Sequence, residues 1–284
     1  MMIHTHSYAE MVVMDGRTLA EENLRALEAE YAALPSSPTL AIVRVGNDPV
    51  IERFVQQKKK IAERLGVRVI ERVFGAELSR TVIRERIGAL AHDRTVDGII
   101  VQLPLPQRLN VQDVLNAITP EKDVDLLSAR SVGNFASGKT TLTPPVVGAV
   151  IALAERYAID LRKKQIAVVG GGRLVGQPIT AWLLHQHIGY TVVTETTPHP
   201  EEIFRRADII ITGVGKRIID SSMVKDGVVV FDAGTSESEG VVQGDVDYDS
   251  VAKKASAISP VPGGIGPLTV VWIFKNLLSL IKLH

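Results

Sequence analysis

The stretch Gln165-Ile-Ala-Val-Val-Gly-Gly-Gly-Arg-Leu-Val-Gly-Gln-Pro178 decides the fold of the second half of this chain. Its apolar run predicts a buried strand, its consecutive glycines a tight turn, and the residues after them the start of a helix. Gly170 and Gly172 permit the turn and a close approach to a pyrophosphate, and Gly176 lets the helix pack against its strand. The alternative is a merely structural turn. We predict a dinucleotide site at Gly170, Gly171, Gly172, Arg173 and Gly176.

Short β-rich runs alternate with amphipathic helical stretches on both sides of this motif, which predicts an α/β fold with right-handed crossovers. The expected strands are residues 39–45, 67–74, 98–103, 166–169, 190–194, 209–212, 228–231 and 257–258. The expected helices are residues 17–33, 49–65, 78–91, 146–157, 174–187, 201–206 and 268–283. The second half is therefore expected to be a Rossmann-like, doubly wound parallel sheet.

Consecutive prolines in Thr143-Pro144-Pro145 break this rhythm and predict a domain boundary. The last helix comes so late that we expect it to return to the first domain. The predicted first domain is therefore residues 1–143 plus 266–284, and the predicted second domain is residues 144–265.

The composition excludes several classes of function. Of the 284 residues, 32 are basic and 32 acidic, which gives no support to nucleic-acid or anionic-membrane binding. The absence of cysteine excludes disulfides and thiolate metal sites, and we predict no metal site. No run approaches the roughly 18 uninterrupted apolar residues of a membrane span. Residues 1–10 lack the pattern of a signal peptide and are interpreted as a leader or an artificial extension. We expect a soluble, cytoplasmic protein.

The tract from Ser259 to Thr269 is rich in proline and glycine, with three of each among the nine residues from Pro260 to Leu268. Proline fixes φ and glycine opens conformations closed to other residues, so the tract predicts one stiff loop. The loop leads directly into the last helix, where bare backbone suits a flat or anionic ligand. A structural crossing between domains is the alternative.

Glu195 follows the predicted strand 190–194 and lies 25 positions after Gly170. Rossmann sites often carry an acidic residue in this region, where it binds the ribose hydroxyls of the adenosine half. Because a carboxylate repels the extra phosphate of NADP, Glu195 locally favours NAD. A solvated strand end is the other interpretation.

Three polar residues of the first half stand out by position. Lys58 lies one helical turn after Phe54 on a mostly apolar helix face, so it is either snorkelling or functional. Gln102 follows a buried strand and precedes two prolines, at the kind of strand end where ligands bind. The alternative for Gln102 is a capped strand terminus. Lys122-Asp-Val-Asp125 is by itself only a charged surface turn.

Together these motifs resemble the bifunctional methylenetetrahydrofolate dehydrogenase/methenyltetrahydrofolate cyclohydrolase family. The resemblance runs in order along the chain from Asp15 to the last helix. Its motifs are Asp15-Gly-Arg, Val45-Gly-Asn-Asp-Pro49, Phe54-Val-Gln-Gln-Lys58, Asp97-Gly-Ile-Ile-Val-Gln-Leu-Pro-Leu-Pro106, Lys122-Asp-Val-Asp125, Gly170 with Val175-Gly-Gln-Pro178, Ala207-Asp-Ile-Ile-Ile-Thr-Gly-Val-Gly-Lys216, Gly244-Asp-Val246 and Pro260–Thr269.

The resemblance implies a cleft between a folate-binding first domain and a Rossmann second domain, in an enzyme that is usually a homodimer. It implies catalytic roles for Lys58, Gln102 and Asp125. It also implies a folate substrate, NADP as the family's usual cofactor, and hydride transfer followed by hydrolysis to the 10-formyl product. The implied substrate-binding residues are Phe54, Val101, Leu103, Pro262, Gly263, Gly264 and Thr269, and Thr235 joins Glu195 and the glycine turn at the cofactor.

The sequence departs from the family pattern near both sites. Phe54 replaces a tyrosine, Ile51 a serine, Leu126 a glycine, and Glu195-Thr196 stands where residues that grip the 2′-phosphate are expected. A dehydrogenase that prefers or tolerates NAD and has weak or absent cyclohydrolase activity is therefore one alternative. A non-catalytic folate- or dinucleotide-binding protein is another. A different two-domain dehydrogenase is disfavoured by residues 101–106 and by the tract 260–269.

Overall fold

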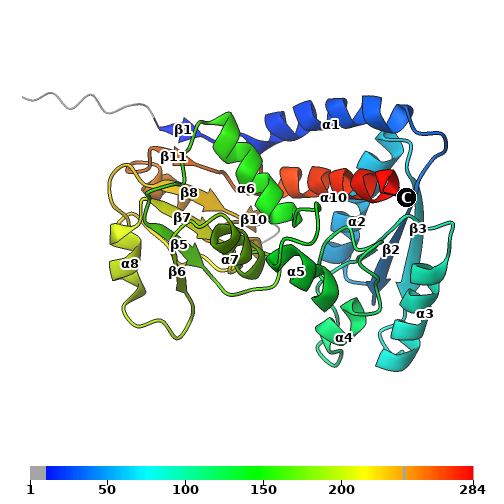
Figure 1. Ribbon diagram of the computed structural model, residues 1–284. Helices are drawn as coiled ribbons and strands as arrows, with labels where there is room; N and C mark the ends of the chain where they lie inside the picture. The colour runs from blue at the N-terminus through cyan, green and yellow to red at the C-terminus, as the bar shows by residue number, and fades with distance from the viewer. Residues whose placement is uncertain (1–10, 239–240, 284) are drawn as a thin grey trace, which may run out of the picture. The chain divides into compact units, whose positions relative to one another are not determined.

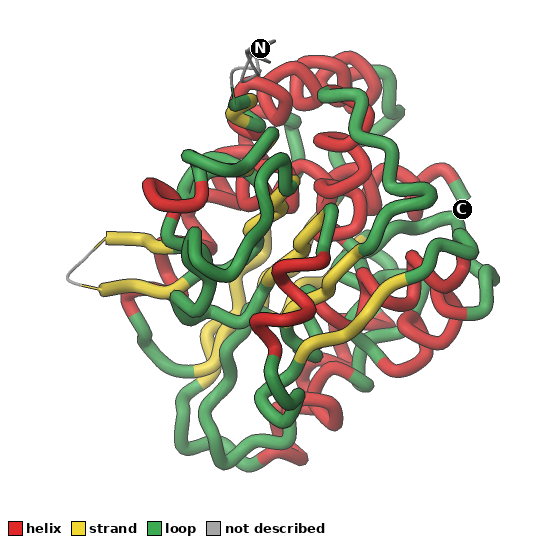
Figure 2. Tube along the Cα trace, turned by 90° about the vertical axis from the view of Figure 1, so that its left-hand side faces the viewer, coloured by secondary structure: helices red, strands yellow, loops and turns green. Residues whose placement is uncertain are grey.

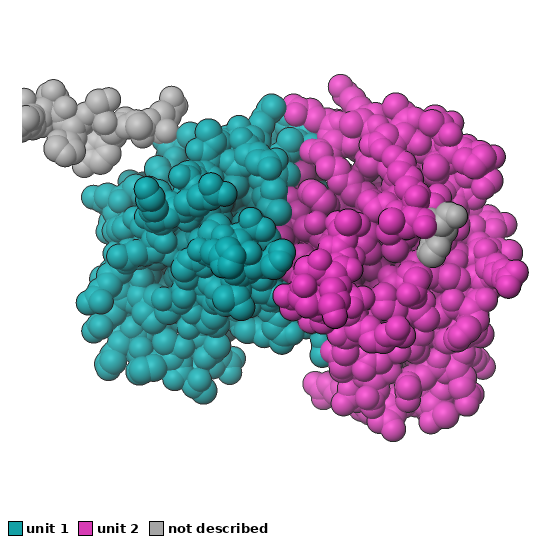
Figure 3. Space-filling view, in the orientation of Figure 1, with its two compact units in different colours: residues 1–19, 149–267 teal, residues 20–148, 268–284 magenta. Residues whose placement is uncertain are grey.

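A computed structural model describes residues 11–238 and 241–283 of the chain. The chain divides into two compact units, coloured separately in Figure 3. Unit 1 comprises residues 1–19 and 149–267, and unit 2 comprises residues 20–148 and 268–284. The leader interpretation of residues 1–10 lies outside the described residues.

Unit 1 is built on a six-stranded sheet in the order β1-β11-β8-β7-β5-β6, in which every described pair is parallel (Figure 1). The chain enters at β5 (Ile166–Val169), adds β6 (Tyr190–Val193) on one side, and then adds β7 (Ile209–Thr212) and β8 (Val229–Asp232) on the other. The strand order reverses between β5 and β7. In open α/β sheets this reversal opens a crevice beyond the carboxyl ends of the strands, where ligands bind.

Helix α7 (Gly176–His185) connects β5 to β6, and α8 (Pro200–Arg206) connects β6 to β7. The short helix α9 (Tyr248–Val251) precedes the last strand of the sheet in the chain. The strands β5 and β7 are entirely buried, which explains why their sequences are continuous apolar runs. A separate hairpin pairs β9 (Ser236–Ser238) with β10 (Val241–Gln243), and Figure 2 shows it as two short antiparallel strands. The expected doubly wound parallel sheet is confirmed.

Two short strands complete the far side of the six-stranded sheet. β1 (Val12–Val13) pairs in parallel with β11 (Ala257–Ile258), which pairs with β8. This pairing explains a difference from the sequence-based boundaries, because it places residues 11–19 in unit 1 and not with the first half of the chain. The two-residue β11 was predicted, whereas the equally short β1 was not, because its strand pairing joins residues far apart in the sequence.

Unit 2 contains a three-stranded parallel sheet in the order β3-β2-β4. The central strand β2 (Thr39–Val45) pairs with β3 (Arg68–Phe74) and β4 (Gly98–Val101). One face of β2 and β4 packs with α3 (Arg80–His92) in a cluster of buried apolar side chains. The shorter helices α4 (Val111–Leu115) and α5 (Ala129–Ala136) follow β4, and neither was expected from the sequence.

Helix α10 (Ile265–Lys282) ends the chain, and its residues from Leu268 onward belong to unit 2. It lies beside α1 (Gly16–Ala32), where the Tyr31 hydroxyl donates to the Phe274 carbonyl at 2.8 Å (Figure 1). By length and composition α10 is the one described helix that could cross a membrane, although the sequence led us to expect none. Half of it is buried, and the buried Asn276 amide donates to the carbonyls of Val124 and Thr143. These contacts are those of a core helix.

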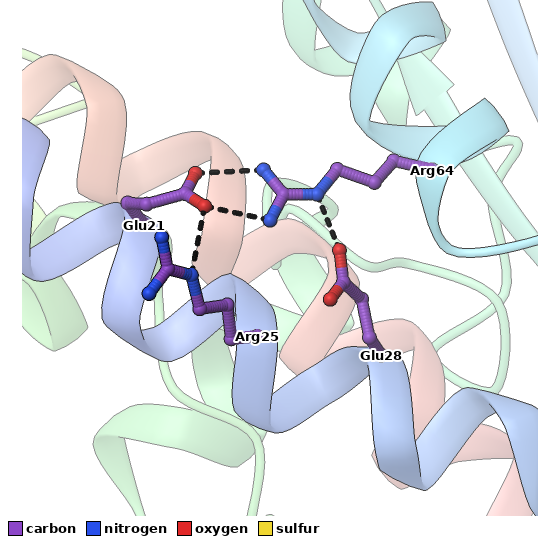
Figure 4. A network of polar contacts seen from close by, with 4 residues as sticks. All are labelled: Glu21, Arg25, Glu28 and Arg64. Atoms are coloured by element: carbon purple, nitrogen blue, oxygen red, sulfur yellow. Dashed lines mark hydrogen bonds and ion pairs between the residues drawn. The ribbon is translucent and has the colours of Figure 1, made fainter.

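Helices α1 and α2 (Pro49–Arg64) of unit 2 are joined by ion pairs at their exposed faces (Figure 4). The Arg64 guanidinium contacts Glu21 through two nitrogens, at 2.6 and 2.7 Å, and also contacts Glu28. Arg25 donates to the same Glu21 carboxylate at 3.2 Å. Arg64 lowers the pKa of Glu21 to about 2, so the network keeps its charge down to low pH.

The bounds of β2, β5, β7 and β11 match the predicted ones, and the other predicted elements differ by at most three residues at either end. The largest shift is at α10, which begins three residues earlier than predicted, whereas β4 ends two residues early at Val101 and α7 begins two residues late at Gly176. Gln102 and the residues after it leave the strand before Pro104, and the Leu103–Pro104 peptide is cis. Helix α6 (Pro145–Arg156) begins at the predicted pair of prolines.

Candidate functional site

Helix α2 of unit 2 carries Lys58 on its buried face. Asp48 caps the helix by accepting from the backbone N–H of Val50 at 2.7 Å, and proline occupies the first turn. The buried residues then recur at helical spacing as Ile51, Val55, Lys58 and Ala62. Lys58 is only 8% exposed, whereas Lys60 on the same helix is exposed. Helical periodicity thus places one ammonium group of the lysine triplet in the interior.

Gln102 of unit 2 is the hydrogen-bond partner of Lys58. The Lys58 Nζ donates to Gln102 Oε1 at 2.9 Å, and Gln102 Nε2 donates to the Leu103 carbonyl at 2.9 Å. The amide is fixed in orientation because one side accepts from the lysine and the other donates to backbone. The backbone N–H of Gln102 donates to the Val43 carbonyl at 2.8 Å, which anchors the residue at the carboxyl end of β4.

Asp125 of unit 2 follows β4 in a tight turn that a second carboxylate holds. The fully buried Asp123 accepts from the backbone N–H groups of Leu127 at 3.2 Å and Ser128 at 2.8 Å. Between these residues Leu126 adopts a φ of 55°, in the left-handed region that favours glycine. The sequence pattern led us to expect glycine at this position, and here a buried leucine adopts the left-handed conformation.

Electrostatics couple Lys58 and Asp125. Burial lowers the pKa of the Lys58 ammonium, and the nearby Asp125 charge acts in the opposite direction. Burial raises the pKa of Asp125 to about 6; the Asp123 charge adds to this shift and the Lys58 charge opposes it. Both groups therefore titrate closer to neutrality than isolated side chains would, as acid–base groups of enzymes do.

Strand alternation separates the other predicted folate residues. Ile99 and Val101 point into the core cluster with Val43, and the half-buried Leu103 packs against the same cluster. Gln102 points to the opposite side, where it meets Lys58. The Val101 side chain is 2% exposed within the core, so the predicted contact of Val101 with substrate would have to be made by its backbone. Phe54 is half-buried on α2, one turn before Lys58.

The glycine turn of unit 1 has the backbone geometry that a dinucleotide requires. Gly170 has a φ of 95°, and a Cβ on Gly176 would lie 1.9 Å from the Gly170 carbonyl oxygen, so both positions demand glycine. Around Gly172 a Cβ would meet nothing within 4 Å, so the turn is open on its outer side. Val175 supplies no side-chain cap to α7, and the Gln177 N–H in the first turn donates to the Gly172 carbonyl at 3.0 Å. The open outer side of the turn is therefore the part of this motif that suits a phosphate.

The remaining predicted cofactor residues lie at the same end of the six-stranded sheet. Glu195 is exposed just after β6, and its neighbour Thr194 lies 3.8 Å from the position of a Cβ on Gly171. Thr235 is exposed after β8, and its carbonyl oxygen lies 3.4 Å from the position of a Cβ on Gly215. The carboxyl ends of β5, β6, β7 and β8 thus gather these residues around the turn.

The proline- and glycine-rich tract forms a closed turn in front of α10. The Gly264 N–H donates to the Pro260 carbonyl at 2.7 Å, and Gly263 has a φ of 116°. A Cβ on Gly16 would lie 1.8 Å from the Gly264 carbonyl oxygen, so the start of α1 packs directly on the tract. Pro262, Gly263 and Gly264 belong to unit 1, whereas Thr269 on α10 belongs to unit 2.

The structure therefore gathers two constellations, one in each unit. Unit 2 brings together Lys58, Gln102 and Asp125. In unit 1, Glu195 follows a neighbour of the glycine turn, and Thr235 lies beside Gly215 in the loop that borders that turn. Two buried carboxylates that hold nearby backbone, Asp123 and Asp245, were not singled out in the sequence. Their only sequence signal was membership of the motifs Lys122–Asp125 and Gly244–Val246, since burial depends on segments distant in sequence.

Two models of one protein family match successive parts of the chain. Residues 14–125 match the model of the tetrahydrofolate dehydrogenase/cyclohydrolase catalytic domain, and residues 144–284 match that of the NAD(P)-binding domain of the same family. The chain is 38% identical to the bifunctional protein FolD of Thermus thermophilus, over 96% of this chain and 97% of that protein.

Solved structures give the same result. The crystal structure of the bifunctional FolD enzyme of Campylobacter jejuni is similar with a TM-score of 0.91 and 32% identity, and covers 96% of this chain and 99% of its own. The Trypanosoma brucei enzyme, solved with NADP and an inhibitor, has a TM-score of 0.90 and 30% identity, with 96% and 98% covered. The chain belongs to the tetrahydrofolate dehydrogenase/cyclohydrolase family.

Proposed function

We propose that this protein oxidises 5,10-methylenetetrahydrofolate to 5,10-methenyltetrahydrofolate and hydrolyses that product to 10-formyltetrahydrofolate, in one-carbon metabolism. The observation that carries the proposal is the buried lysine that donates to a strand-end amide beside a carboxylate of raised pKa. Structural lysines rarely occupy such a position, because burying an ammonium costs free energy that only a specific role offsets.

In this proposal Lys58 moves protons at the reacting carbon. Burial lowers its pKa, which raises the neutral fraction that can accept a proton from an attacking water. A neutral amine is also compatible with the positively charged methenyl group, which an ammonium would repel. Gln102 orients the amine through its 2.9 Å hydrogen bond, and Asp125 holds the N–H groups of the pterin.

The residues of unit 1 fit a nicotinamide dinucleotide. The open turn around Gly172 would hold the pyrophosphate, and Arg173 would add positive charge. When bound, the dinucleotide supplies hydride acceptance at its nicotinamide ring. The protein contributes orientation and the exclusion of side reactions.

We infer that NAD is used in preference to NADP or alongside it. The support is the exposed Glu195 beside the glycine turn, because a carboxylate there accepts from ribose hydroxyls and repels a 2′-phosphate. The ratio of kcat/KM for the two cofactors tests this, with Glu195→Ser expected to shift it toward NADP. A wild-type kcat/KM that is much higher with NADP would contradict the preference.

We also propose that the cyclohydrolase step is slow relative to the dehydrogenase step. Phe54 keeps an aromatic face one helical turn from Lys58 but lacks a hydroxyl that could relay a proton. The Phe54→Tyr variant should increase the rate at which methenyltetrahydrofolate absorbance disappears, with little change in hydride transfer. A wild-type rate as fast as the dehydrogenase step, or no gain in the variant, would contradict this cause.

We propose a cytoplasmic homodimer, as the resemblance implies. The edge strand β3 supports a dimer, since it pairs only with β2 among the described strands and exposes Val73. A single species of twice the chain mass in solution is the expected result.

A non-catalytic binding protein remains the second candidate, and the replaced hydroxyls at Ile51 and Phe54 favour it. An isotope experiment separates the two. With substrate deuterated at the methylene carbon, an enzyme transfers the label to the reduced nicotinamide, whereas a binding protein leaves the label on the folate. Label transfer lost in Lys58→Met would assign the reaction to this site.

A further inference from the structure

The loop after β7 in unit 1 is exposed, yet a fully buried carboxylate holds it. Residues 214–217 are exposed, and Gly215 has a φ of 79°. Asp245, which is 0% exposed, lies about thirty positions further along the chain. An exposed loop has water available for its backbone groups, so it has no intrinsic need for a buried charge.

Each of the two carboxylate oxygens of Asp245 accepts two hydrogen bonds. Oδ1 accepts from the backbone N–H groups of Gly215 at 2.8 Å and Lys216 at 2.9 Å. Oδ2 accepts from the Thr212 hydroxyl at 2.6 Å and from the Val214 N–H at 2.6 Å. The carbonyl of Asp245 also accepts from Ile218 at 2.8 Å. A single residue therefore fixes the loop from the end of β7 through Ile218.

The surrounding backbone is shaped to admit this carboxylate. A Cβ on Gly234 would lie 2.1 Å from Asp245 Oδ1, so only glycine fits there. The second buried carboxylate, Asp232, accepts from the Asp245 N–H at 3.1 Å and from the Val246 N–H at 3.0 Å. Burial raises the pKa of Asp232 to about 6, and the Asp245 charge adds to the shift.

The position of the loop links it to the dinucleotide site. It follows β7, and the glycine turn follows β5, and the strand order reverses between these two strands. Val214 Cγ2 lies 3.1 Å from the position of a Cβ on Gly170, so the loop borders the turn directly. Val214 is itself 39% exposed, an apolar side chain beside the crevice.

We propose that Asp245 is a positioning residue for the dinucleotide: it fixes loop 213–216 as one wall of the cofactor site. This inference rests on the proposed function, because it requires that unit 1 binds a nicotinamide dinucleotide. Because the loop is already rigid, dinucleotide binding loses less conformational entropy. Loss of the Asp245 hydrogen bonds should therefore weaken cofactor affinity and leave folate affinity unchanged.

The Asp245→Asn variant tests the proposal sharply. In asparagine an NH₂ group replaces one of the two carboxylate oxygens. This NH₂ group cannot accept the two hydrogen bonds that the replaced oxygen accepted, so two donors lose their partner. We expect the dissociation constant for NADH or NADPH, measured by nucleotide fluorescence without folate, to rise at least tenfold. The KM for folate should stay within about twofold, and the backbone N–H groups of residues 214–216 should exchange hydrogen faster.

Asp208→Asn is the matched control. Asp208 is a carboxylate just before β7, at the opposite end of that strand from the loop that Asp245 holds. It accepts from the Gln165 N–H at 2.7 Å and from Lys225 at 2.6 Å. A merely structural role for Asp245 predicts that both variants lose stability and keep their cofactor affinity. The proposal predicts weaker dinucleotide binding in Asp245→Asn alone.

Thr212→Val provides a second route if Asp245→Asn does not fold. It removes one donor to Asp245 Oδ2 and should raise the dissociation constant severalfold. Unchanged affinity in a folded Asp245→Asn, or in Thr212→Val when the first variant fails to fold, overturns the proposal. Absence of dinucleotide binding by the wild type would instead overturn the proposed function.

Discussion

Lys58 combines burial, an amide partner and a nearby carboxylate, and each of these has a measurable consequence. Because burial lowers its pKa, the folded state disfavours the ammonium form relative to the unfolded chain. The lysine therefore costs stability below its folded pKa, and this cost disappears as the pH rises toward its ordinary value. A residue kept at such a cost is typical of an active site.

We predict that Lys58→Met lowers turnover at least about 100-fold without lowering the melting temperature at neutral pH. Methionine fills a similar volume on the apolar face and removes the buried charge. Lys60→Met is the control, since Lys60 is exposed on the same helix and should leave both quantities unchanged. Unchanged turnover together with a lower melting temperature in Lys58→Met would make the lysine structural.

The raised pKa of Asp125 predicts that kcat/KM for the folate depends on pH. Burial raises its pKa to about 6, so the carboxylate takes up a proton as the pH falls through that value. We expect kcat/KM for the folate to fall below about pH 6, and Asp125→Asn to lack this limb of the profile.

The same raised pKa affects stability with a defined sign. The folded carboxyl keeps its proton to a higher pH than the unfolded one does. Its contribution to the free energy of unfolding therefore decreases as the pH rises from about 4 to about 6. Chemical denaturation across this range should show that decrease in the wild type and a smaller one in Asp125→Asn. Equal slopes for the two proteins would contradict the assignment.

At the scale of elements, close helix packing in unit 2 depends on one glycine. A Cβ on Gly148 in α6 would lie 2.1 Å from the ring of Trp272 in α10. We predict that Gly148→Ala destabilises the protein by about 1–3 kcal/mol, because the rigid indole has to shift.

The helical glycine Gly133 in α5 is the control, because a Cβ there would meet nothing within 4 Å. Gly133→Ala should stabilise by up to about 1 kcal/mol through helix propensity. Urea denaturation midpoints measure both, and a reversed order of the two variants would contradict the packing argument.

The same scale shows what the sequence could predict. Long apolar runs and helical spacing predicted β2, β5, β7, α2 and the last helix, because in these elements burial repeats over several residues. The two-residue β1 and the short α4 and α5 carry too few residues for a pattern. Lys58 could be predicted from its helix face, whereas Asp245 could not, because its loop partners lie about thirty residues away in sequence.

On the scale of the whole molecule, the two units carry complementary halves of one chemistry. In the proposed function, unit 2 supplies an acid–base constellation for the one-carbon substrate, and unit 1 supplies a switch-point crevice with a glycine turn for the dinucleotide. Neither constellation by itself could carry out the proposed oxidation, which needs both a folate and a hydride acceptor. Family membership over both matched segments explains why a single chain retains both.

The initial rate of nicotinamide reduction by the purified chain, with 5,10-methylenetetrahydrofolate and either NAD or NADP, tests the central claim most directly. We predict a folate-dependent rate of at least about 1 per second with one of the cofactors, abolished by Lys58→Met and retained by Lys60→Met. Binding of both ligands without reduction, or a rate that survives the loss of Lys58, would contradict the account.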